Sequence, residues 1–180
     1  MSVDHIIFEY DKRFDTDGDF DDNYKVTEKM QKRYDITINN AKEFLKECAK
    51  QKVHFHPIGV IQAWSPNSMK RAASELIDMG YTYIAIGGLV PLDINSCEEI
   101  VKSVRDEIGY EVRIHLLGFA KAKQLQRFEK YKITSFDSTS PLIRAFKDKK
   151  DNYYTPKEHY TAIRIPSSQK TAALKRKISS

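Results

Sequence analysis

The sequence predicts an α/β protein with parallel strands. Short apolar runs alternate with amphipathic helical patterns at intervals of roughly 22 to 30 residues, which is typical of β-α units joined by right-handed crossovers. The chain has 180 residues, 41% of them hydrophobic, enough for one core. Five such strands would be part of a closed (β/α)8 barrel or a complete open doubly wound sheet, and the pattern alone leaves both possible.

The first predicted unit begins with Val3–Phe8, an apolar run suited to a buried strand. An acidic stretch from Asp11 to Asp22 follows and is expected to form an exposed loop. A helical region is expected next, and its best-patterned part is Ile38–Lys50, where apolar residues recur at helical spacing.

The second unit has clear boundaries. Val53–Gln62 returns to strand character, and Ser65 as N-cap with Pro66 at the first helical position predicts a helix to about Met79 that ends at Gly80.

The same order of elements then repeats. The predicted elements are a strand Tyr81–Ile86, a helix opened by the capping box Asn95-Ser96-Cys97-Glu98 and ending near Gly109, a strand Val112–Leu117, a helix Lys121–Tyr131, a strand Ile133–Phe136 and a short helix Leu142–Phe146.

Composition excludes several classes of protein. No apolar run is long enough to span a bilayer, and the N-terminus lacks the features of a signal peptide, so we expect a cytoplasmic protein without a membrane partner. The two cysteines, Cys48 and Cys97, stand apart in predicted helices and are expected in the core. The net charge of +5 includes basic runs at Arg144–Lys150 and Lys170–Lys177, which suit either a polyanionic partner or an ordinary solvated surface.

Candidate site residues gather at the predicted carboxyl ends of the strands, where parallel α/β proteins carry their active sites. Glycines there let a ligand approach the backbone, Gln62 offers a donor and an acceptor, and Asp137 offers a carboxylate, so a planar heterocycle could lie beside a carboxylate. Alternatively, Asp137 only caps the next helix, and Gly87-Gly88 is only a tight turn. In chain order these positions are Tyr10 and Asp11, Gln62, Gly87-Gly88-Leu89, Gly118 and Asp137.

Two patterns in the sequence are similar to metal sites, but neither predicts a metal. His54 and His56 share one strand face but lie near the start of the strand, where structural roles are more common. The aspartates at 15, 17, 19 and 21 do not fit a calcium loop, because no frame places Gly sixth and Glu twelfth. We expect no metal and no cofactor.

The region Phe146–Arg164 interleaves basic residues with tyrosines. This mixture suits phosphates and stacked bases, but aromatic residues that pack back onto a barrel would look the same. The basic residues taken as candidate nucleic-acid contacts are Arg144, Lys147, Lys149 and Lys150.

Several motifs together resemble the tRNA-guanine transglycosylase superfamily. They are YIAIGGL at Tyr83–Leu89, HLLGF at His115–Phe119, TSFDSTSP at Thr134–Pro141, GVIQ at Gly59–Gln62 and VDHIIFEYD at Val3–Asp11. The resemblance implies a (β/α)8 TIM barrel of which this chain supplies about strands 4 to 8, over residues 1–148, followed by a basic and aromatic segment at 149–180 that is expected to be partly flexible.

The resemblance also implies an activity. Asp137 would attack the ribosyl C1′ atom, expel guanine and hold the sugar covalently until a 7-deazaguanine base replaces it. Asp11 would recognise the base, with Tyr10 as the alternative at the aligned position. The remaining implied base contacts are Gln62, Gly87, Gly88 and Leu89 at the base edge and Leu117 and Gly118 at its face.

Within the superfamily, the segment with the sequence STSPLIRAFKDKKDNYY is most similar to the DNA-acting branch, the deoxypurinosine-in-DNA protein A group. Ser138 stands where the tRNA enzymes carry Cys, so the resemblance favours DNA over tRNA as substrate. The second catalytic aspartate of the family, near its second strand, has no counterpart here. A separate N-terminal barrel half is therefore an expected partner, and the alternatives are an inactive nucleic-acid-binding remnant or a complete flavodoxin-like domain that binds a nucleotide or flavin.

Overall fold

The computed structural model describes residues 1–15, 25–119, 122–147, 152–154 and 158–161. The chain divides into two units, Met1–Ser138 and Thr139–Ser180, which we describe separately. None of the helices in the described ranges has both the length and the apolar character needed to cross a bilayer.

The first unit is built on a four-stranded parallel sheet. Its strands are β1 (Gly59–Ile61), β2 (Tyr83–Ile86), β3 (Arg113–Leu116) and β4 (Ser135–Phe136), and they lie in the order β1-β2-β3-β4. The predicted α/β alternation with parallel strands is confirmed. A flavodoxin-like sheet would reverse its strand order at a switch point, whereas these strands follow one another in sequence, as they would in a segment of a barrel.

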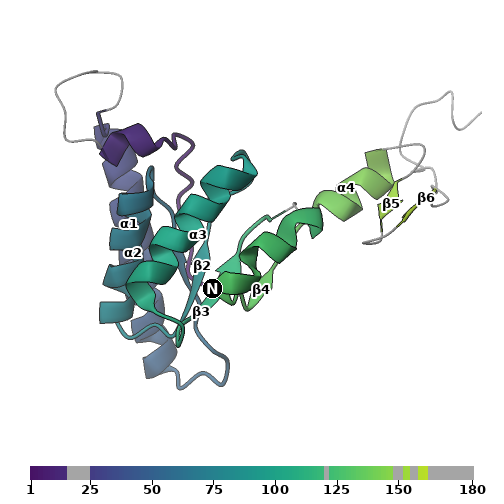
Figure 1. Cartoon of the computed structure of the whole chain (residues 1–180). Helices are drawn as coiled ribbons and strands as arrows, with labels where there is room; N and C mark the ends of the chain where they lie inside the picture. Colours follow the sequence, from purple (N-terminus) through teal and green to yellow (C-terminus); the bar gives the residue numbers. More distant parts are fainter. Residues whose placement is uncertain (16–24, 120–121, 148–151, 155–157, 162–180) are drawn as a thin grey trace, which may run out of the picture. The chain divides into compact units, whose positions relative to one another are not determined.

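Helices connect the strands and cover one face of the sheet. The connecting elements are α1 (Glu28–Lys50) before β1, α2 (Pro66–Asp78), α3 (Ile94–Ile108) and the 3-10 helix η3 (Ala122–Tyr131), with a short 3-10 helix η1 (Lys12–Asp15) near the start. Figure 1 shows α1, α2 and α3 arranged alongside the sheet. Ile84, Ile86, Ile114 and Leu116 of the strands share one buried cluster with Leu76 and Val104 of these helices. Both cysteines are buried, as predicted.

The predicted start of α2 is confirmed in detail. Ser65 is fully buried, its hydroxyl accepts a hydrogen bond from the Ser68 amide at 3.2 Å, and Pro66 occupies the first turn. The Ser68 hydroxyl bonds back to the Ser65 amide at 2.9 Å, so the two serines form a reciprocal capping box. Gly80 follows the helix with φ +100°, a conformation that favours glycine.

The predicted strand at Val3–Phe8 is wrong. The segment has no regular secondary structure. The His5 amide donates to Thr37 Oγ1 at 2.9 Å and the Ile7 amide to Gln62 Oε1 at 3.1 Å, so both bond to side chains and not to a neighbouring strand. Ile7 alone of its large apolar residues is buried, while Phe8 is 69% exposed.

Other predicted boundaries moved for local reasons. The predicted capping box at Asn95 is wrong, because the Asp93 carboxylate caps α3 by accepting hydrogen bonds from the Asn95 amide at 2.8 Å and the Ser96 amide at 3.1 Å. The strand expected over Val53–Gln62 is confined to β1. The helical region expected after the acidic stretch is α1, which begins at Glu28 and includes the best-patterned part at Ile38–Lys50. The helix expected over Lys121–Tyr131 is η3, of 3-10 type.

Arg105 of α3 joins three segments at the amino end of the sheet. Its side chain is almost fully buried, and its guanidinium donates to the carbonyl oxygens of Tyr131 at 3.0 Å, Gly109 at 2.5 Å, Val112 at 2.8 Å and Lys132 at 3.3 Å. Burial lowers the pKa of Arg105. The residue therefore ties α3 to the connections that lead into β3 and β4.

The second unit contains α4 (Ser140–Lys147) and an antiparallel pair, β5 (Tyr153–Tyr154) with β6 (His159–Tyr160). The helix confirms the short helix predicted near Leu142–Phe146, whereas the pair of strands was not predicted.

Candidate active site

The face of the sheet opposite the helices carries the candidate site. Successive side chains of a strand point to opposite faces, so the partners of Ala85 lie on the face away from the buried isoleucines. The register pairs Ala85 with Val60 and His115, and His115 with Ser135. Two residues further along each strand, the same register leads to Gln62, Gly87, Leu117 and Asp137.

Backbone hydrogen bonds carry this row beyond the strands proper. The Gly87 amide bonds to the Ile61 carbonyl at 3.0 Å, the Leu117 amide to Ile86 at 3.0 Å and the Asp137 amide to Leu116 at 3.2 Å. Three residues predicted from the strand ends, Gln62, Gly87 and Asp137, therefore form a single row at the carboxyl edge of the sheet with Leu117, which only the family resemblance implied.

Asp137 follows β4, and its carboxylate is held in place. Its Oδ1 atom accepts hydrogen bonds from the Gly118 amide at 2.8 Å and from His115 Nε2 at 3.2 Å. The side chain is 53% exposed, so its other oxygen is accessible to a ligand. A carboxylate that is both oriented and accessible can act as a nucleophile.

Gln62 and Gly87 pack directly against each other at the other end of the row. Gln62 is buried, its Oε1 accepts from the Ile7 amide at 3.1 Å, and its Nε2 donates to Asp4. A Cβ atom on Gly87 would lie only 2.7 Å from Gln62 Nε2, so the glycine makes room for the amide. To read a base edge, the Gln62 side chain would have to exchange these bonds for bonds to the base.

The other predicted base contacts lie in the two turns after β2 and β3. Gly88 has φ +78° and Gly118 has φ +65°, and both conformations favour glycine. Leu89 is fully buried in the core, so any contact it makes with a base would come from its backbone. Leu117 is half-buried in the row.

Asp11 lies beside the turn that follows β2. It lines a surface cavity together with Leu92 and Asp93. Its carboxylate binds Arg13, with Oδ1 2.9 Å from Nε, and this pairing lowers the pKa of Asp11. The neighbouring Tyr10 hydroxyl is buried and has no hydrogen-bond partner among the described residues.

The remaining predicted candidates are placed only in part. His54 and His56 lie on an exposed loop before β1. Arg144 and Lys147 lie in α4, while Lys149, Lys150 and the aspartates at 17, 19 and 21 fall outside the described residues. Within the described ranges, His, Cys, Asp and Glu side chains form no group of three that could hold a metal ion.

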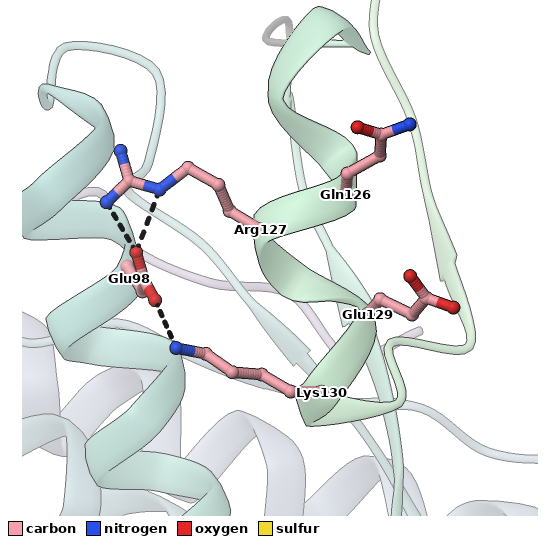
Figure 2. Close-up of a pocket in the computed structure, with 5 residues that line it drawn as sticks. All are labelled: Glu98, Gln126, Arg127, Glu129 and Lys130. Atoms are coloured by element: carbon pink, nitrogen blue, oxygen red, sulfur yellow. Dashed lines mark hydrogen bonds and ion pairs between the residues drawn. The ribbon is translucent and has the colours of Figure 1, made fainter.

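A cavity between α3 and η3 is occupied by ion pairs. Figure 2 shows Arg127 and Lys130 directed at Glu98, with Gln126 and Glu129 turned away from it. Arg127 contacts Glu98 Oε2 at 2.6 Å and Lys130 contacts Oε1 at 2.8 Å, which lowers the pKa of Glu98. One carboxylate of α3 thus binds two cations of η3, and these ion pairs link the two helices.

Sequence reasoning missed three polar residues that lie behind Asp137. His115 Nδ1 is 2.7 Å from Ser135 Oγ, which is 2.6 Å from the Tyr83 hydroxyl. The guanidinium of Arg113 lies 4.6 Å from the centre of the Tyr83 ring. Counting back two residues from Leu117 and Asp137 along their strands would have found His115 and Ser135, because alternate residues share a face.

Fold and site together define a parallel α/β protein whose polar site, with an oriented carboxylate, lies at the carboxyl ends of its strands. Over 181 aligned residues, the chain is 37% identical to a DNA-guanine transglycosylase from Salmonella montevideo. The predicted relationship is confirmed: the chain is a homologue of a transglycosylase, consistent with the tRNA-guanine transglycosylase superfamily and with a C-terminal half.

The alignment includes the whole of this chain but 42% of the relative, so the chain spans less than half the length of the protein it matches. No model of a protein family matches the chain.

Proposed function

We propose that the protein takes part in exchanging guanine for a 7-deazaguanine base in nucleic acid, with DNA as the preferred substrate over tRNA and Asp137 as the nucleophile. The observation that carries this proposal is the oriented, half-exposed Asp137 carboxylate, set in one row with Gln62 and Gly87. The name of the Salmonella relative supports DNA and guanine as the substrate class.

The proposed exchange takes two displacements at C1′. In the first, an Asp137 oxygen bonds to C1′ while the bond from C1′ to N9 of guanine breaks, and guanine leaves with the electron pair and gains a proton from water. In the second, N9 of the incoming base bonds to C1′, the ester bond breaks and the N9 proton passes to water. The two inversions restore the original configuration at the sugar.

The proposal also assigns residues that contact the base and the phosphates. Gly88 leaves backbone accessible to a planar base, because among the described residues only Gln62 Oε1 lies within 4 Å of its Cβ position. Gly87 and Gly118 make room for the side chains of Gln62 and Val90 instead, and together with Leu89 and Leu117 they would lie beside the base. Asp11 would recognise the base from the neighbouring turn. We further propose that Arg144, Lys147, Lys149 and Lys150 bind phosphates of the nucleic acid.

A separate N-terminal barrel half is the proposed partner, and the chain would supply about strands 4 to 8 of a complete (β/α)8 barrel. Among the described residues, β4 pairs with β3 alone, so that edge of the sheet is open to a further strand. At the other edge the N-terminal segment already lies beside β1, because the Val60 amide donates to Ser2 Oγ at 2.9 Å and the Ser2 amide to the Ile58 carbonyl at 2.9 Å. A closed barrel would remove both edges.

The test uses protein purified from the cells that make it, so that any associated chain is retained. We expect it to release labelled guanine from DNA when a 7-deazaguanine base is added, and to form a denaturant-resistant adduct with DNA. Asp137→Asn should abolish both signals, because an amide is a poor nucleophile. Asp106→Asn is the matched control, since Asp106 is an exposed residue of α3 paired with Lys102.

The outcomes separate the alternatives. An adduct that survives in Asp137→Asn would show that another residue is the nucleophile. Salt-dependent DNA binding without an adduct, unchanged by Asp137→Asn, would identify an inactive binding protein. A parallel assay with tRNA tests the preference for DNA.

A further inference from the structure

We infer that His115 is a positioning residue that holds the Asp137 carboxylate and stabilises it as the leaving group of the second displacement. This inference rests on the proposed function and goes beyond it, because it assigns a task to a chain of polar side chains behind the nucleophile. The chain runs from Tyr83 through Ser135 to His115 and ends at Asp137.

The geometry of the chain is continuous across three strands. The Tyr83 hydroxyl of β2 is 2.6 Å from Ser135 Oγ of β4, which is 2.7 Å from His115 Nδ1 of β3. The other imidazole nitrogen, Nε2, is 3.2 Å from Asp137 Oδ1. The His115 side chain is 14% exposed, so nearby water cannot easily replace these partners.

These contacts fix which nitrogen of His115 carries the proton. An ionised Asp137 can only accept hydrogen bonds, so Nε2 must be the donor. In neutral His115, Nδ1 then accepts from the Ser135 hydroxyl, and Ser135 accepts from Tyr83. Every donor in the chain therefore points toward Asp137, and the imidazole is held in the Nε2–H form.

Both donors to Asp137 converge on the same oxygen. The Gly118 amide and His115 Nε2 bond to Oδ1, and in the part of the chain that the structure describes no hydrogen bond reaches Oδ2. The geometry therefore assigns Oδ2 as the oxygen that bonds to C1′. Oδ1 becomes the carbonyl oxygen of the ester and regains charge when the ester breaks.

The two displacements respond differently to the loss of His115. In the first, the hydrogen bonds stabilise the reactant carboxylate, so their loss removes orientation but leaves a more reactive oxygen. In the second, the carboxylate is the group released, and its donors stabilise the developing charge. Removing the His115 donor should therefore slow breakdown of the ester more than its formation, and the covalent adduct should accumulate.

The experiment measures how fast the adduct with DNA breaks down after a chase with the incoming base, using the same protein preparation. In His115→Phe we expect breakdown roughly tenfold to a hundredfold slower, as for the loss of a hydrogen bond to a charged group. His115→Gln retains an N–H donor on its side chain and should recover part of the rate. His54→Gln, on an exposed loop, is the matched control and should behave as the wild type.

A second variant guards against misfolding of His115→Phe. Ser135→Ala leaves His115 in place but removes the hydroxyl that sets its tautomer, and we expect a smaller delay of the same sign. Nitrogen chemical shifts of the His115 ring give a readout without catalysis, since the wild type should show a protonated Nε2 and an unprotonated Nδ1.

Each outcome decides a separate claim. If the wild type forms the adduct and both His115 variants break it down at the wild-type rate, the inference is overturned while the proposed function stands. If Nδ1 carries the proton in the neutral ring, the assigned direction of the chain is also wrong. If no adduct forms in the wild type, the proposed function fails, and the inference fails with it.

Discussion

Replacing Arg105 with methionine tests whether one buried guanidinium holds the sheet and its connections together. The guanidinium donates to four carbonyl oxygens from two connecting segments, at 2.5 to 3.3 Å. Methionine keeps most of the apolar stem but has no donor, so all four acceptors lose a partner in a region where Arg105 is 2% exposed. Counting about 1 kcal/mol for each bond gives a loss of about 4 kcal/mol in the free energy of unfolding.

Urea unfolding followed by circular dichroism measures this loss, and for a unit of this size the melting temperature should fall by roughly 10 °C. Arg105→Lys keeps the charge but has no planar fork of donors, so its free energy of unfolding should lie between those of the wild type and Arg105→Met. Lys102→Met on the same helix is the control, because Lys102 is an exposed partner of Asp106 and its loss should cost about 0.5 kcal/mol or less. If Arg105→Met unfolds within about 1 kcal/mol of the wild type, the four bonds do not stabilise the connections as argued.

Three further predictions follow from contacts at other positions. Gly87→Ala places a Cβ atom 2.7 Å from Gln62 Nε2, so it should lower the unfolding free energy by about 1 to 3 kcal/mol in urea titrations and displace the amide. Ser65→Ala removes the N-cap of α2 and should lower the unfolding free energy by about 1 kcal/mol in urea titrations. Ser65→Thr keeps a capping hydroxyl and should retain most of that stability. Glu98 has a lowered pKa, so its ion pairs stabilise the fold above its usual pKa of about 4.5 and lose this effect as the pH falls through the folded value. Glu98→Gln should therefore have a lower unfolding free energy than the wild type at pH 7. If urea titrations show that this difference does not shrink in acid, the ion pairs of Glu98 do not stabilise the fold as argued.

Much of the sheet could be predicted from the sequence because its signals are local. Ser65 and Pro66 mark the start of α2, and an apolar run marks β2 without reference to the rest of the chain. The segment Val3–Phe8 has the same apolar composition as a strand, yet its amides bond to the side chains of Thr37 and Gln62. Those partners lie more than 30 residues away in the sequence, and no local pattern reveals them.

The candidate site shows the same division between local and distant information. Asp137, Gly87 and Gln62 could be picked out because each follows a recognisable strand, and a parallel sheet brings strand ends to one edge. Their assignment to base exchange came from resemblance to a family, and it remains a prediction that the Asp137 variants will test. The burial of Arg105 was not predicted, because an arginine in an amphipathic helix usually lies on the surface.

The network behind Asp137 depends on register, which sequence patterns do not supply. A shift of one residue between β3 and β4 would move Ser135 to the opposite face from His115 and would break the chain to Tyr83. The same register places Asp137 where the Gly118 amide and His115 can both reach one of its oxygens. The orientation of the proposed nucleophile therefore depends on three strands in register. The group that orients such a residue is expected on the same face of a neighbouring strand, two positions before the strand end.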